Sequence, residues 1–258
     1  MQKPSRILLT NDDGIDAEGL QAMHRAVKET LIVAGFEDVE IVVVAPDRGR
    51  SECGHSIETS TPLTVRQRRE DWYAVNGTPV DCIRVAFFAL ELRPDIVFSG
   101  INAGANLGVN LMVSGTFAAA REASLLGVPA FAASHYRRPE VQRTWEHTAE
   151  WLRRPTLQFL DSLEGRFRPA PAQPSAPLWN VNLPAIQPET DDQGSYRVPP
   201  TVECKVDRCP IGRRGFMGED GQVNFELDFH NREREDDRDV QHCFAGNITI
   251  SRVSPQCF

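Results

Sequence analysis

Residues 7–14 read ILLTNDDG, and residues 15–31, IDAEGLQAMHRAVKETL, follow at once. The first four residues form an apolar run of strand length. The second stretch places Leu20, Met23, Ala26, Val27 and Leu31 at three- and four-residue spacing, which is typical of an amphipathic helix. A short strand that runs directly into a helix predicts the first unit of an α/β fold.

The two adjacent aspartates at the end of this strand need an explanation. An Asp-Gly turn accounts for Asp13 and Gly14, but it gives Asp12 no role. Two neighbouring carboxylates repel each other unless a cation or a hydrogen-bond network compensates them. The pair is therefore either a structural turn or a binding site, and the rest of the chain has to decide.

The same alternation of strand and helix continues to residue 135. Further strands are predicted at 40–45, 95–99 and 130–133, and helices at 16–34, 79–90 and 116–126. Thr78 can cap the second helix, with Pro79 in its first position. A hairpin is expected from TPLTVRQ at 61–67 to WYAVNG at 72–77. The predicted class is α/β: a Rossmann-like, three-layer, doubly wound and mostly parallel sheet with a β-hairpin insertion.

Beyond residue 135 the pattern changes. Residues 139–162 look helical, the Pro- and Ala-rich stretch 166–178 reads as a connection, and 178–183 reads as a returning strand. The charged stretch DFHNREREDDRD at 228–239 is not expected to contribute to the core, and NITISRV at 247–253 looks like a final strand. We therefore expect a core domain at 1–189 and an extension at 190–258 that serves in oligomerisation.

Bulk composition excludes several classes of function. The 258-residue chain carries a formal net charge of -8, which disfavours a binding surface for long nucleic acid. It has no apolar run long enough to cross a membrane, and residues 1–10 lack the apolar core of a signal peptide, so a cytoplasmic protein is expected. The cysteines are scattered, and the spacing of Cys204 and Cys209 with His230 or His242 fits no common zinc template.

Polar side chains follow three of the predicted strands. Asp12 and Asp13 follow the first, Ser51 and His55 the second, and the glycine-rich segment with Asn102 and Asn106 the third. In an open parallel sheet, ligands bind beyond the carboxyl ends of the strands, so these groups are expected at one edge. Carboxylate, hydroxyl and amide oxygens suit a hard divalent cation such as Mg²⁺ or Mn²⁺.

A second feature lies nearby in the sequence. Ser114, Gly115 and Thr116 precede or open the third predicted helix, whose free N–H groups and dipole favour an anion such as phosphate. A divalent cation beside a phosphate site indicates phosphoryl transfer or hydrolysis of a phosphate ester.

Structural explanations exist for each residue taken alone. Asn102 and Asn106 could serve a left-handed turn, Ser114 and Thr116 could be helix caps, and His55 could be a loop histidine rather than a general acid or phosphate contact. A dinucleotide site is disfavoured because glycines 100, 104 and 108 do not form G-x-G-x-x-G. A serine hydrolase is disfavoured because no G-x-S-x-G elbow occurs.

Five ordered motifs closely resemble those of the SurE survival-protein nucleotidases. They are ILLTNDDG, APDRGRSECGHSI, NGTPVDC, DIVFSGINAGANLG and VSGTFAAAREASLLGVPAFAAS, between about residues 5 and 135. The resemblance implies one divalent cation per subunit, held by Asp12, Asp13, Ser51 and Asn102, with the two aspartates as the catalytic residues. It also implies phosphate contacts from Asn106, Ser114, Gly115 and Thr116.

The activity implied by the resemblance is hydrolysis of nucleoside 5′- and 3′-monophosphates, with short polyphosphate as a further substrate. It also implies a homodimer or homotetramer in which C-terminal elements are exchanged between subunits. The alternative is a regulatory protein that binds a phosphorylated metabolite without turnover, although an anion site alone gains nothing from two carboxylates. The sequence leaves open whether water or an aspartate attacks phosphorus.

Overall fold

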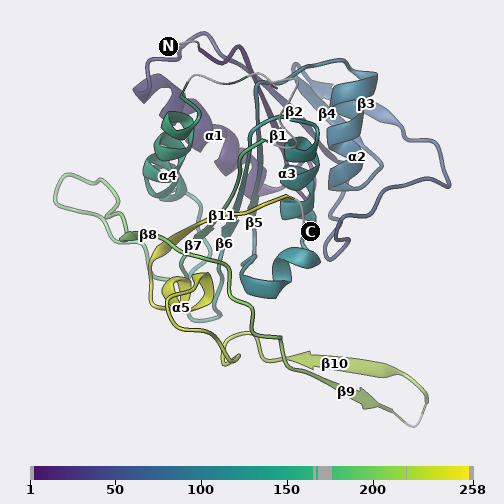
Figure 1. The fold of residues 1–258 in the computed structure, drawn as a ribbon, viewed down its shortest axis with the longest axis vertical. Coiled ribbons are helices and arrows are strands. Elements are labelled where there is room, and N and C mark those ends of the chain that lie inside the picture. The colour runs from purple at the N-terminus through teal and green to yellow at the C-terminus, as the bar shows by residue number, and fades with distance from the viewer. Residues whose placement is uncertain (1–2, 165–166, 168–175, 219, 256–258) are drawn as a thin grey trace.

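The computed structural model describes residues 3–164, 167, 176–218 and 220–255 (Figure 1). A central sheet has the strand order β3-β4-β2-β1-β5-β6-β7-β11-β8, and β9 and β10 form a separate hairpin. The strands are β1 (Arg6–Thr10), β2 (Glu40–Pro46), β3 (Val65–Arg69), β4 (Trp72–Val75), β5 (Ile96–Asn102), β6 (Ala130–His135), β7 (Leu178–Leu183), β8 (Thr201–Glu203), β9 (Arg213–Met217), β10 (Val223–Leu227) and β11 (Ile248–Arg252).

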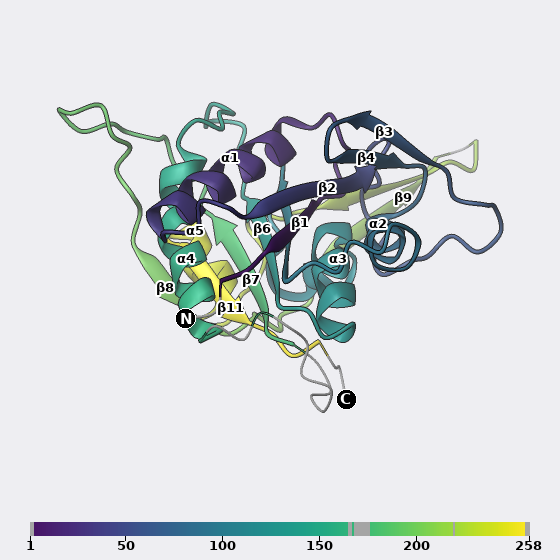
Figure 2. The same cartoon turned by 90° about the horizontal axis from the view of Figure 1, so that it is seen from above.

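Helices cover both faces of the sheet and make the three layers that the sequence predicts. They are α1 (Glu18–Val33), α2 (Pro79–Arg84) with the π-helical η1 (Val85–Ala89), the 3-10 helix η2 (Gly108–Met112), α3 (Gly115–Leu125), α4 (Thr148–Ser162) and α5 (Asp239–Phe244). α1 and α4 lie on one side of the sheet, and α2 and α3 lie on the other (Figure 2). The α/β class with a mostly parallel central sheet is confirmed.

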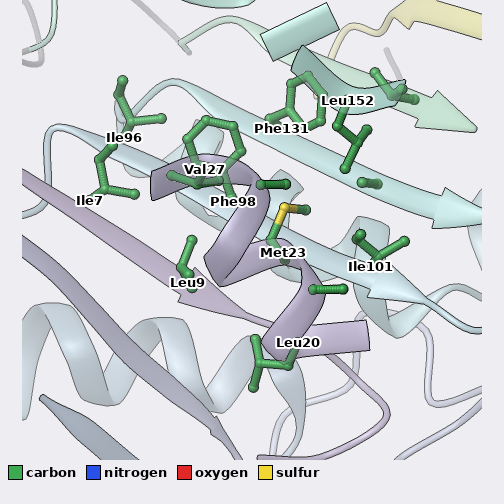
Figure 3. Close-up of a cluster of buried hydrophobic side chains, with 14 of the residues drawn as sticks. Ile7, Leu9, Leu20, Met23, Val27, Ile96, Phe98, Ile101, Phe131 and Leu152 are labelled. Atoms are coloured by element: carbon green, nitrogen blue, oxygen red, sulfur yellow. The ribbon is translucent and has the colours of Figure 1, made fainter. Parts of the chain in front are cut away.

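The alternation of side chains along β1 produces these two layers. Ile7 and Leu9 point into the core under α1 and α4, whereas Leu8 points into the core under α2 and α3. Figure 3 shows the first of these cores, where Met23 and Val27 of α1 lie over the strands. Apolar spacing of 3.6 residues in the helix and 2 in the strand is what allows both to bury a face.

The connections place a topological switch point between β1 and β5. From β1 the chain passes through α1 to β2 on one side, and it later returns to β5 on the other side of β1. β1 is parallel to both neighbours. The crevice beyond their carboxyl ends is the usual ligand position of such a sheet.

Local signals in the first half of the chain are confirmed. Thr78 and Asp81 form a complete capping box, and Pro79 is the first residue of α2. The predicted hairpin forms as β3 and β4 and extends the edge of the sheet, because β4 also pairs with β2.

The second half departs from expectation at one helix. α4 begins at Thr148 and not at 139, since the chain first turns and the carbonyl of Trp145 accepts hydrogen bonds from the backbone N–H and hydroxyl of Thr148. The returning strand β7 and the final strand β11 are confirmed, and β11 runs antiparallel to β7. The sequence did not predict β8, α5 or the β9–β10 hairpin. Most of the Pro-rich stretch that was expected as a connection lies outside the described residues.

The expectation that the charged stretch 228–239 stays out of the core is wrong at two positions. Arg232 is buried, and Asp239 has no exposed surface. The carboxylate of Asp239 accepts backbone N–H groups of Gly108, Asp207 and Val240, which compensates its burial. Among the helices of the described ranges, none combines the length and the apolar character that a membrane crossing requires.

Candidate functional site

A cleft of about 240 Å³ opens at the carboxyl ends of β1 and β5. It is lined by Asp12, Asp13, Ser51, Glu52, Asn102, Ala103, Ala105, Asn106, Asn110, Val113 and Ser114. All four predicted metal ligands are therefore brought to one cavity, together with Asn106 and Ser114. Five of these side chains were expected together from the strand ends, and Ser114 was expected nearby from the start of the third predicted helix.

Asp12 is the buried member of the aspartate pair, with only 6% of its surface exposed. The hydroxyl of Thr116 donates to its Oδ1 over 2.5 Å, and its backbone carbonyl accepts the N–H of Arg50. Burial, reinforced by the neighbouring Asp13, raises the pKa of Asp12 to about 6 against the lowering effect of Thr116. A carboxylate held in this way is costly to ionise without a nearby positive charge.

Asp13 is less buried than Asp12 and holds the loop that follows β5. Its Oδ2 accepts the backbone N–H of Ala103 over 3.0 Å, which ties the end of β1 to the loop after β5. Burial raises the pKa of Asp13, while the bond from Ala103 and the charge of Arg137 lower it. Asp13 therefore supports the loop after β5 and also lines the cleft.

The amide of Asn102 has an orientation fixed by its partner. Its Nδ2 donates to the carbonyl of Gly104 over 2.8 Å, and a carbonyl oxygen can only accept. Oδ1 is consequently the end of the amide that can bind a cation. Two carboxylates, one hydroxyl and one amide oxygen make a donor set that fits Mg²⁺ or Mn²⁺.

Softer metals find no comparable site in the structure. Within residues 3–164, 167, 176–218 and 220–255, no group of three or more His, Cys, Asp and Glu side chains is placed to hold a metal ion. The aspartate cleft is not a group of this kind, because half of its proposed donors are neutral oxygens.

The start of α3 forms the wall of the cleft behind Asp12. The Oγ of Ser114 accepts the N–H of Phe117 over 3.0 Å, so Ser114 is a helix cap whose hydroxyl hydrogen is left to donate elsewhere. Gly115 lies so close to Asp12 that a Cβ there would be 2.9 Å from the Cβ of Asp12. Gly115 and Thr116 therefore stand behind the aspartate and are not among the residues that line the cleft.

His55 lies outside the cleft lining, against the outer part of α3. Arg121 Nε donates to its Nδ1 over 3.0 Å, and its Nε2 lies 2.9 Å from a carboxylate oxygen of Glu122. An arginine can only donate, so Nδ1 accepts and the ring proton sits on Nε2, where it donates to Glu122. Both ring nitrogens are occupied, so the geometry gives no support to a general acid or phosphate contact and shows an anchor for the loop that carries Ser51.

Several contributors to the cleft were not predicted. Glu52, Asn110 and Val113 line it, and Asn180 and Asn182 of β7 lie directly behind Asn106. A signal for the last two was present, since asparagines at alternating positions in an apolar strand place two amides on one face.

Comparison with known proteins identifies the family of this chain. The family described as survival protein SurE matches residues 7–201. The chain is 37% identical to the 5′-nucleotidase SurE of Neisseria gonorrhoeae, over 95% of this chain and 90% of that protein. It is 37% identical to the 5′-nucleotidase SurE of Pelobacter propionicus, over 89% of each.

A solved structure has the same fold. The crystal structure of the SurE protein from Aquifex aeolicus superposes with a TM-score of 0.71 at 26% sequence identity, covering 98% of this chain and 94% of that one. Sequence profile, full-length relatives and tertiary structure agree, and the chain therefore belongs to the SurE survival-protein family.

Proposed function

We propose that this protein is a divalent-metal-dependent phosphomonoesterase that hydrolyses nucleoside monophosphates to nucleoside and phosphate. The observation that carries the proposal is the buried Asp12 beside Asp13, in a cleft walled by the N-terminus of α3. A phosphate in this cleft would meet two carboxylates of its own sign and a third from Glu52. Such a site can accept an anion only with a cation between them.

The proposal gives each residue a distinct task. Asp12, Asp13, Ser51 and Asn102 would hold one Mg²⁺ or Mn²⁺ ion per subunit. When bound, this cation supplies charge neutralisation at the phosphoryl oxygens and a more acidic water. Ser114 and Asn106, which line the cleft, would bind phosphate oxygens. The N–H groups of Gly115 and Thr116, which lie behind the lining at the start of α3, would complete the phosphate site. The dipole of α3 favours the same anion.

The attacking group follows from the arrangement around Asp12. Its Oδ1 already accepts the hydroxyl of Thr116, and the residue is buried against Gly115. Both contacts fix the carboxylate in place, which suits a ligand better than a nucleophile that must move. We therefore favour attack by water. An acid-quenched phospho-enzyme carrying label from a phosphate-labelled substrate would assign attack to an aspartate instead.

The test is phosphate release from a panel of nucleoside 5′- and 3′-monophosphates with Mg²⁺, Mn²⁺ or EDTA. We expect release to need the metal and to fall by about 100-fold or more in Asp12→Asn and Asp13→Asn, since loss of a direct ligand exceeds the usual effect of an outer one. Asp16→Asn is the matched control, because this nearby aspartate is exposed and pairs with Arg68 at the surface.

Two other outcomes would change the proposal. Nucleotide binding without release would identify a regulatory phosphometabolite binder. Full activity in EDTA would remove the cation from the mechanism. We also propose that 3′-monophosphates and short polyphosphate are secondary substrates. The same panel, extended to short polyphosphate, tests this substrate range.

We also propose that the protein functions as a homodimer or homotetramer in which C-terminal elements are exchanged between subunits. The β9–β10 hairpin projects away from the body of the subunit (Figure 1). Met217, Val223 and Phe225 share one face of this hairpin and are 76%, 47% and 72% exposed. An uncovered apolar strip of this kind supports a protein partner, and a second copy of the chain is the partner we propose.

A further inference from the structure

The backbone of Asn106 is held by two side chains of a strand that contributes nothing to the cleft lining. Asn182 Oδ1 accepts the N–H of Asn106 over 2.9 Å, and Asn182 Nδ2 donates to the carbonyl of Asn106 over 3.0 Å. Asn180 Nδ2 donates to the same carbonyl over 2.9 Å. Both hydrogen-bonding groups of the Asn106 backbone are therefore satisfied from β7.

Only asparagine supplies this pair of bonds at position 182. One amide presents a donor and an acceptor side by side, as a neighbouring strand would. Aspartate at this position lacks the donor, and an apolar residue lacks both groups. Asn182 is fully buried and Asn180 is 1% exposed, so bulk solvent does not reach these hydrogen bonds in the native structure.

The second asparagine leaves one of its polar atoms without a hydrogen bond to the described residues. Asn180 Oδ1 is buried and makes no hydrogen bond to the described residues. A buried acceptor without a hydrogen bond is unfavourable, so the contribution of this amide to the structure comes from its donor, Nδ2. That donor fills the second lone pair of the Asn106 carbonyl.

The side chain of Asn106 is fixed from the strand between. Its amide lies 2.8 Å from the hydroxyl of Ser134 on β6, and that hydroxyl can accept or donate. The backbone of Asn106 is thus held by β7 and its side chain by β6, although Asn106 itself lies in the loop after β5. The position of Asn106 in the cleft is decided by the sheet and not by the loop.

We propose that Asn182, assisted by Asn180, is a positioning residue that holds Asn106 in register with the phosphate site. This inference rests on the proposed function, in which Asn106 contacts phosphate. Asn182 touches neither substrate nor cation and acts through the Asn106 backbone. Without it, the N–H of Asn106 would lose its partner, and the carbonyl would keep only the bond from Asn180.

The test compares wild type, Asn182→Ala and Asn180→Ala for the affinity of inorganic phosphate in the presence of Mn²⁺, for Mn²⁺ affinity and for turnover. We expect Asn182→Ala to weaken phosphate binding and kcat/KM by about 10- to 100-fold, the usual range for an outer-shell partner. Mn²⁺ affinity should change by less than about 2-fold, because its proposed ligands come from β1, β2 and β5. Asn180→Ala, which keeps the reciprocal pair, should show a smaller loss of the same kind.

Thr249→Val is the matched control. Thr249 lies directly opposite Asn182 on β11, is 1% exposed, and its hydroxyl makes no hydrogen bond to the described residues. Valine has nearly the same shape, so this variant should keep wild-type phosphate affinity. It reports what a buried substitution in this layer does by itself.

The outcomes separate the two proposals. Wild type that binds phosphate but does not release it from nucleotides overturns the proposed function, and the binding comparison still decides the role of Asn182. Folded Asn182→Ala with unchanged phosphate affinity overturns the positioning role, as does an equal loss of Mn²⁺ and phosphate affinity. If Asn182→Ala does not fold, unchanged phosphate affinity in Asn180→Ala overturns it.

Discussion

At the scale of single residues, the cleft depends on close packing as much as on charge. Gly115 illustrates this, because a Cβ at this position would lie 2.9 Å from the Cβ of Asp12 and 3.0 Å from the Sγ of Cys53. Contacts this short force neighbouring atoms to move. The sequence predicted Gly115 as a phosphate contact, and the structure adds that its missing side chain leaves room for the aspartate.

Substitution of Gly115 tests that packing. We expect Gly115→Ala to displace Asp12, to lower the free energy of unfolding by about 1–3 kcal/mol as an overpacking change, and to weaken Mn²⁺ binding. Gly212→Ala is the control, because nothing lies within 4 Å of a Cβ there. Denaturant unfolding and Mn²⁺ titration give the two readouts. Unchanged Mn²⁺ affinity in Gly115→Ala would contradict the link between this glycine and Asp12.

A buried pair of histidines gives a prediction for pH. His135 Nδ1 must donate to the carbonyl of Tyr136, so its Nε2 accepts the Nε2 proton of His147 over 2.8 Å. His135 is therefore neutral, and His147 could hold a second proton only on Nδ1, which faces the hydroxyl of Thr144. Burial, reinforced by Arg137, lowers the pKa of His147 to about 4 and that of His135 well below its usual value. The unfolded chain binds these protons first, so acid should favour unfolding.

We expect the free energy of unfolding to fall as the pH drops from about 6.5 to about 4, by about 3 kcal/mol from His147. Asp12 acts in the opposite sense, because its raised pKa makes the folded chain bind a proton first as the pH falls through 6. The measurement is therefore the difference in unfolding free energy between wild type and His147→Gln at several pH values. That difference should shrink or change sign on acidification. A difference that is constant with pH would show that His147 does not titrate abnormally.

At the scale of secondary-structure elements, the C-terminal segment is tied to the cleft through one carboxylate. Asp239 at the start of α5 accepts the N–H of Gly108, the first residue of η2. Gly108 has a φ of +57°, and a Cβ there would be 2.5 Å from Nη2 of Arg232. Because η2 follows Asn106 and includes Asn110, the extension supports part of the cleft wall.

Asp239→Asn tests that connection. The new amide can keep one acceptor but must turn its NH₂ toward one of the backbone donors, which leaves a buried N–H unpaired. We expect the free energy of unfolding to fall by about 1–3 kcal/mol and kcat/KM to fall with it. Glu235→Gln is the control, since Glu235 belongs to the same stretch but binds Arg208 at the surface. Wild-type stability in Asp239→Asn would refute the tie.

The elements themselves were predictable where local signals were strong. In residues 6–135, apolar residues that repeat every 2 or every 3.6 positions predicted the strands and helices, and Thr78 predicted the start of α2. β8, α5 and the β9–β10 hairpin were not predicted, because they are short segments in which polar and apolar residues are mixed and no strong local signal marks their ends. Asp239 is the clearest case, since a charged residue is buried only where other segments bring N–H groups to it.

At the scale of the whole molecule, self-association is the property open to direct measurement. We expect Met217→Ser combined with Phe225→Ser to lower the sedimentation mass at a given concentration, because it removes apolar area from the projecting hairpin. Phe88→Ser is the control, since Phe88 is 67% exposed but lies on η1. Unchanged mass in the hairpin variant would exclude this strip from the subunit interface.

The sequence by itself determined the α/β class, the order of strands and helices through residue 135, and the expectation that polar side chains from three strand ends and one helix start lie close together. These properties follow from local periodicity, from the rule that parallel strands present their carboxyl ends at one edge, and from the free N–H groups at the start of a helix. Tertiary structure alone decided the orientation of the Asn102 amide, the position of His55 outside the cleft, and the hydrogen bonds from β7 to the backbone of Asn106. Each of these depends on hydrogen bonds between segments distant in the chain, whose geometry no local pattern encodes.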